Sequence, residues 1–167
     1  MHRLIQINTR WLQQALELLN VIDDRVYATT PAGFSPHKAG AHLRHILEFY
    51  ECLLDATGRV IDYDARKRDV AIEMSREAAA VRIQSLMKRL QNLLFADPNC
   101  PLRVRAEDSN DFVGSTLTRE LASLSSHTIH HFALIAMTLR AHGVTLHPDF
   151  GMAPSTLRYR LSQKEAA

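Results

Sequence analysis

Apolar residues recur every three or four positions through four segments of the chain, and polar residues fill the positions between them. This spacing places the apolar side chains on one face of a helix, so each segment is predicted to be amphipathic. The predicted helices cover about Leu4–Val26, His37–Ala56, Arg76–Phe95, and a last segment that ends near Ala141. Helices of this length joined by loops predict an all-α protein, a four-helix bundle that forms one domain over residues 1–167.

Side chains suited to helix capping precede three of these helices. Ser35–Pro36 lies before the second helix, Ser75 before the third, and Ser115 or Thr116 before the fourth. Such hydroxyl groups accept hydrogen bonds from backbone N–H groups in the first turn, and proline is favoured at the first helical position. The sequence therefore predicts where these three helices begin.

The segments between the helices differ in character. Ile61–Asp69 is dense in charge and has no clear period, which indicates an ordered loop whose charges face water. Pro101–Glu107 alternates apolar and basic residues, so it is predicted to be a short edge strand or hairpin arm. The tail Val144–Ala167 contains proline and glycine. We expect a loop packed on the bundle, with a short helix over Ser155–Leu161.

Composition and charge exclude several classes of protein. The formal net charge is only +2, with acidic residues interspersed among basic ones, so we expect no nucleic-acid partner. Hydrophobic residues make up 46% of the chain, but no apolar run has the length of a membrane span and the first residues do not form a signal peptide. The two cysteines, Cys52 and Cys100, form no CxxC pair. These features predict a reduced, cytoplasmic protein.

Two of the nine histidines, His127 and His131, lie four positions apart in the last predicted helix and therefore point in the same direction. Leu124 and Ile135 fall on the same stripe, which makes it the face turned toward the core. Two buried imidazoles need partners for their nitrogens, and a metal ion supplies one to each ring. His130 is rotated away from this stripe, so it is predicted to be a rim residue or a partner of a ligand.

The second helix offers a third imidazole from either His42 or His45, both near its apolar side. Three histidines are a common ligand set for a catalytic metal, because they leave coordination positions open for water or substrate. If the second and fourth helices are neighbours, one of the two histidines reaches the pair on the fourth helix while the other hydrogen-bonds nearby. The spacing alone leaves the choice open.

The motifs His42–Glu48 and Ser126–His131, the loop Asp62–Asp69 and the tail Gly151–Tyr159 resemble the bacterial branch of the DinB superfamily. The resemblance covers most of the chain. It implies a four-helix bundle with up-down-down-up connectivity and a long crossover. It also implies a divalent metal, zinc or nickel, and pairing into homodimers. The implied metal ligands are His45, His127 and His131.

Characterised members of this family act on low-molecular-weight thiols. They include bacillithiol transferases, a mycothiol-dependent maleylpyruvate isomerase and domains of ergothioneine synthesis, while many other members have no known reaction. The resemblance therefore implies a small-molecule substrate such as a thiol, and a transferase as the class of enzyme. Kinship of fold does not by itself carry over an activity.

A three-histidine site would leave the +2 charge of the ion uncompensated, so a thiol bound there would lose its proton more readily. Catalytic candidates are Glu48 and Glu120, which could orient a ligand imidazole, and Tyr63, which with Asp64 could close over the metal. Four arginines could hold an anionic part of the substrate, with a solvent-facing position as the competing interpretation: Arg44, Arg66, Arg68 and Arg119. The alternative hypothesis is a non-catalytic, metal-stabilised dimer or small-molecule binding protein.

Overall fold

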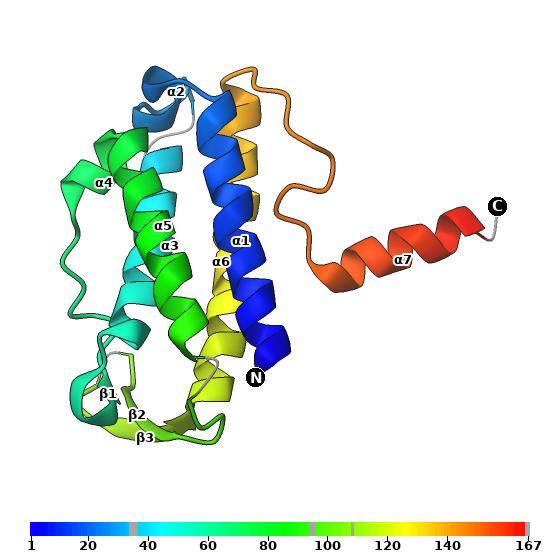
Figure 1. Ribbon diagram of the computed structural model, residues 1–167. Coiled ribbons are helices and arrows are strands. Elements are labelled where there is room, and N and C mark those ends of the chain that lie inside the picture. The colour runs from blue at the N-terminus through cyan, green and yellow to red at the C-terminus, as the bar shows by residue number, and fades with distance from the viewer. Residues whose placement is uncertain (34–36, 94–95, 108, 166–167) are drawn as a thin grey trace.

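The computed structural model describes residues 1–33, 37–93, 96–107 and 109–165, and the chain is mainly helical. Four long helices lie side by side (Figure 1) and bury one continuous apolar core. They are α1 (His2–Val21), α3 (Ala39–Leu54), α5 (Arg76–Asn92) and α6 (Leu117–Ala141). The amphipathic spacing predicted each of them. The proposed start at Ser35–Pro36 and the proposed end at Phe95 lie outside the described residues.

The order and direction of the four helices require one long connection. Figure 1 shows α1 and α6 running in one direction and α3 and α5 in the other. Because α3 and α5 are neighbours that run the same way, the chain must travel back along their length between them. This crossover contains a 3-10 turn at Thr57–Arg59, strand β1 (Val60–Ile61) and the short helix α4 (Val70–Met74).

A small three-stranded sheet covers one end of the helices, so the prediction of an all-α chain was incomplete. Strand β2 (Pro101–Arg105) lies in the centre of the sheet. It pairs with β1 in parallel and with β3 (Phe112–Thr116) in antiparallel orientation. The strand predicted over Pro101–Glu107 forms, and it is the arm of a hairpin with β3; it is central in the sheet, so the edge-strand alternative is wrong. Its partner β1 has only two residues and lies about forty positions earlier in the sequence, so no local pattern indicates that pairing.

Two helix boundaries differ from their predictions for local reasons. The segment predicted as one helix to Val26 divides into α1 and α2 (Asp24–Ala28), because the Asp23 side chain accepts a hydrogen bond from the Val26 N–H and caps a new helix. The caps by Ser75 and Thr116 are confirmed. The tail helix α7 (Pro154–Glu165) is longer than predicted and stands away from the other helices (Figure 1).

None of the helices within the described ranges has both the length and the apolar character needed to cross a bilayer.

A hydrogen-bonded polar cluster joins three of the long helices inside the core. The Asn8 side-chain amide donates to the Leu4 and Leu121 carbonyl oxygens, at 2.8 and 3.0 Å. Its carbonyl oxygen accepts from the Tyr50 hydroxyl at 2.6 Å, and that hydroxyl lies 3.2 Å from the Thr128 hydroxyl. All three side chains are fully buried. The cluster therefore connects α1 and α3 to α6. Helices α3 and α6 carry the predicted metal ligands.

We expect Tyr50→Phe to lower the free energy of unfolding by about 1–3 kcal/mol. The substitution keeps the ring but removes the hydroxyl, which leaves the Asn8 carbonyl oxygen buried without its donor. Urea denaturation followed by circular dichroism measures the change. An unchanged free energy of unfolding would show that the cluster does not stabilise the packing of α3.

Candidate metal centre

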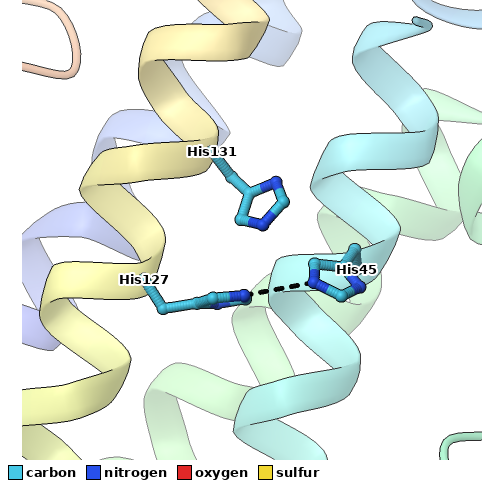
Figure 2. Close-up of side chains that lie close together, drawn as sticks. All are labelled: His45, His127 and His131. Atoms are coloured by element: carbon cyan, nitrogen blue, oxygen red, sulfur yellow. Dashed lines mark hydrogen bonds between the residues drawn. The ribbon is translucent and has the colours of Figure 1, made fainter.

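Three imidazole groups meet between α3 and α6, about halfway along both helices. Figure 2 shows His127 and His131 projecting from α6 toward His45 on α3. One nitrogen of each ring can be chosen so that all three atoms lie within 4.8 Å of one another. The Nε2 atoms of His45 and His127 are 3.1 Å apart. The structure thus brings together the three residues named from the sequence, and it selects His45 rather than His42.

The geometry and the donor set fit a divalent ion. Nitrogens bound to one tetrahedral zinc ion, each about 2.0–2.1 Å from it, lie about 3.3 Å apart. The separation between His45 and His127 is close to this value. Nε2 of His127 is therefore the nitrogen that would bind the ion, and a metal ion is a partner that imidazole readily takes. Nδ1 of His127 is buried without a hydrogen-bond partner within the described residues, but it lies on the other side of the ring and is not part of this group.

The remaining histidines of this region lie around the three-histidine group. His42, the rival third ligand, places its Nδ1 atom 3.1 Å from Nδ1 of His131. His130 is exposed and directs its ring edge-on to His131, with 5.2 Å between the ring centroids. His130 therefore lies at the rim, as predicted, and His42 is placed as a neighbour of one ligand.

All three grouped imidazoles favour their neutral form. Burial first, and then repulsion from neighbouring imidazolium and guanidinium groups, lower the pKa of His45 and of His127 to about 4. Burial and repulsion from neighbouring imidazolium groups lower the pKa of His131 to about 3. A neutral imidazole is the form that binds a metal ion. The site is therefore ready to accept an ion throughout the neutral range of pH.

These shifts predict that the metal-free protein loses stability as the pH falls. A lowered pKa in the folded state means that unfolding takes up protons, so this stability is complete above the unfolded value of 6.5 and is lost as the pH falls toward 4. A full shift would correspond to about 3 kcal/mol per histidine. Because the rings are partly open to solvent, we expect about 2 kcal/mol in total between pH 7 and pH 5.

Urea denaturation of the chelator-treated protein at these two pH values checks the prediction. The variant His127→Gln should show a smaller difference between them, because one shifted group is removed. Equal stability of the wild-type protein at pH 7 and pH 5 would contradict it.

The two candidate carboxylates are buried, but each accepts hydrogen bonds from groups other than the three histidines. Glu48 accepts hydrogen bonds from the Arg44 guanidinium and from the Asp69 backbone N–H, so it holds the crossover against α3. Glu120 accepts from the hydroxyls of Tyr63, at 2.8 Å, and Ser115. Within the described residues neither carboxylate accepts a hydrogen bond from a ligand imidazole, and the idea that they orient one finds no support.

A cavity of about 560 Å³ opens beside the histidines and reaches from His45 and His127 to the sheet. Tyr63 and Asp64 of the crossover line it, together with Glu120 of α6.

Of the four arginines proposed to hold an anion, Arg66 and Arg119 line this cavity. Arg44 pairs instead with Glu48 and Glu73 outside the cavity lining, and Arg68 is exposed and also outside it.

The sequence analysis did not single out Phe49 and Arg105, which both line this cavity. Phe49 stacks on the His127 ring, with 4.1 Å between the centroids, and it also contacts the rings of His45 and Tyr63 and the Arg66 guanidinium. Its position four residues after His45 was the available signal, because residues four apart share a helix face. Arg105 enters from β2 and pairs with Asp62 at 3.0 Å. Its placement depends on the sheet, which the sequence did not predict in full.

The fold and the site together define a mainly helical protein with a three-histidine group between two adjoining helices. No known family profile matches the chain, and no solved structure matches it. The chain is similar to FK506-binding protein 5 from Rhizopus delemar, with 34% identity over 105 residues. The aligned region covers 60% of this chain and 27% of that protein. The chain thus spans about a quarter of the relative that it matches.

Proposed function

We propose that this chain is a divalent-metal-dependent enzyme of the DinB superfamily, a transferase that acts on a low-molecular-weight thiol. The observation that supports it most directly is the convergence of His45, His127 and His131 within 4.8 Å of one another, beside a cavity of about 560 Å³. A site with only three protein ligands keeps a coordination position for substrate, and the cavity gives the substrate room.

The arrangement of the helices supports the same proposal. Two long helices run in each direction, and the crossover of residues 55–75 joins two parallel neighbours (Figure 1), as the resemblance to DinB proteins implies. On this basis we propose a DinB-type four-helix bundle that pairs into homodimers. The reduced, cytoplasmic location stays a prediction from the sequence.

In the proposed reaction a zinc or nickel ion would supply the positive charge that favours the deprotonated form of a substrate thiol. The neutral imidazoles of His45, His127 and His131 would hold the ion without cancelling its charge. Arg119 and Arg66 line the cavity and would attract a carboxylate or another anionic group of the substrate.

The aromatic side of the cavity would restrict water and hold a proton donor. The rings of Phe49 and Tyr63 stack with 4.8 Å between their centroids, and Phe49 covers one face of the His127 ring with apolar surface. Burial and the neighbouring Glu120 carboxylate raise the pKa of the Tyr63 hydroxyl, so that hydroxyl keeps its proton at neutral pH. Tyr63 is therefore placed to donate a hydrogen bond to Glu120 rather than to act as a base.

The proposal is tested by metal analysis and by thiol consumption. The protein purified without chelator is expected to contain about one zinc or nickel ion per chain. It should then consume the sulfhydryl group of at least one small thiol in a panel of thiols and electrophiles, and stop doing so after treatment with a chelator. A metal content near zero, even after incubation with zinc or nickel, would contradict the proposed metalloenzyme.

The second candidate function is a non-catalytic, metal-stabilised bundle. It is favoured by the engagement of Glu48 and Glu120 with other side chains, which leaves neither as an evident general base. A bound ion without turnover across the panel, sealed by a fourth protein ligand, would support this function instead. The similarity to FK506-binding protein 5 covers 27% of that protein, so its name is not used to propose a ligand.

A further inference from the structure

A row of three imidazoles leads from the metal-binding group to the surface. Nδ1 of His131 lies 3.1 Å from Nδ1 of His42, and Nε2 of His42 lies 3.2 Å from Nδ1 of His37. The rings of His37 and His42 are nearly parallel, with 11° between their planes. His37 is exposed, His42 is half-buried, and His131 belongs to the three-histidine group.

The protons along this row can be assigned from the chemistry of a neutral imidazole, which carries one N–H donor and one acceptor nitrogen. Since Nδ1 of His131 faces His42, its Nε2 atom is the nitrogen left to bind an ion. His131 then carries its proton on Nδ1 and donates it to Nδ1 of His42. That acceptor role places the proton of His42 on Nε2, from where it is donated to Nδ1 of His37. Every nitrogen between neighbouring rings thus has a complementary partner.

We propose that His42 is a positioning residue, which fixes the ring and the tautomer of His131 so that Nε2 is presented to the ion, and that His37 supports His42 in turn. This inference rests on the proposed metal site. Histidine ligands usually donate their second N–H to a carboxylate, a backbone carbonyl or water. Here the acceptor is another imidazole from the same helix as the ligand His45, and within the described residues no carboxylate takes its place.

The choice of acceptor has a consequence for the charge of the site. A carboxylate acceptor would bring a negative charge close to the ion, whereas neutral His42 brings none. The row therefore orients His131 while it leaves the positive charge of the ion available to a bound thiol. Consistent with this, none of the three histidines donates a hydrogen bond to Glu48 or Glu120 in the described part of the chain.

The test measures zinc affinity of the whole chain by competition with a chromogenic chelator. His42→Leu is expected to weaken zinc binding by about 10- to 100-fold, the range typical for loss of an outer partner of a ligand. His42→Asn should restore most of the affinity, because the asparagine amide oxygen can occupy the position of Nδ1 and accept the same proton. His130→Leu is the matched control, since it removes the other histidine beside His131, and it should bind zinc like the wild type.

Nitrogen NMR of the metal-free protein gives a second readout that a loss of packing would not imitate, because a bound zinc ion would itself fix the proton of His131 on Nδ1. We expect His131 to be protonated on Nδ1 in the wild type and in His42→Asn, and to lose that defined tautomer in His42→Leu. Zinc affinity of His42→Leu equal to the wild type would overturn the inference and leave the proposed function intact. Complete loss of binding in His42→Asn would also overturn it, because His42 would then be a ligand. A wild-type chain that binds no zinc would overturn the proposed function and this inference with it.

Discussion

Replacing His127 with alanine is expected to reduce the affinity for zinc or nickel by more than about 100-fold. The variant removes one of three ligands, and this costs more than removal of an outer partner, for which 10- to 100-fold is typical. His127 contacts both the His45 ring and the Phe49 ring, and the group found among the described residues holds no fourth histidine that could substitute for it. Metal content after gel filtration should fall from about one ion per chain to near zero.

The matched control is His130→Ala, on the same turn of α6 but exposed and outside the three-histidine group. It should retain the wild-type metal content. Both variants should keep the helical circular dichroism of the metal-free protein, because neither truncated side chain belongs to the buried core. Equal metal content in His127→Ala and the wild type would place the ion, if one is bound, somewhere else.

The sequence was sufficient to predict the part of the site whose residues lie on one helix. The four-residue spacing of His127 and His131 was sufficient to put them on one face, and the leucines around them indicated that this face turns inward. The choice of His45 over His42 depends on how two helices that are distant in the sequence are rotated against each other. The spacing left that choice open, and the resemblance to DinB proteins indicated His45.

The parts that could not be predicted depend on contacts between distant segments. Strand β1 has two residues and forms only because β2 offers it a parallel partner, so its sequence carries no alternation of its own. The hydrogen-bond partners of Glu48 and Glu120 depend on the crossover and the sheet. These segments bring Asp69, Tyr63 and Ser115 to the two carboxylates. Helix periodicity predicts the helix face on which a carboxylate lies, but it does not identify the group that hydrogen-bonds to it.

Gly40→Ala is expected to destabilise the protein by about 2–4 kcal/mol, although alanine is the better helix former. Within an exposed helix the same change would stabilise by about 1 kcal/mol. Here a Cβ atom on residue 40 would lie 2.1 Å from the backbone carbonyl oxygen of Glu73 in α4 and 3.0 Å from the Tyr27 ring. Backbone cannot turn aside as a side chain can, so α4 must move and the cost of overpacking exceeds the gain in helix propensity.

Movement of α4 would also disturb the hydrogen bond of 2.6 Å that the buried Tyr27 hydroxyl donates to the Ile72 carbonyl oxygen. Urea denaturation of the variant, compared with Gly114→Ala, measures the effect. A Cβ atom at Gly114 meets no atom within 4 Å, so that control should change the free energy of unfolding by less than about 0.5 kcal/mol. A Gly40→Ala variant as stable as the wild type would mean that α4 does not rest against α3 at this glycine. The part of the crossover that leads to α5 would then be held in place mainly by Glu48 and Arg44.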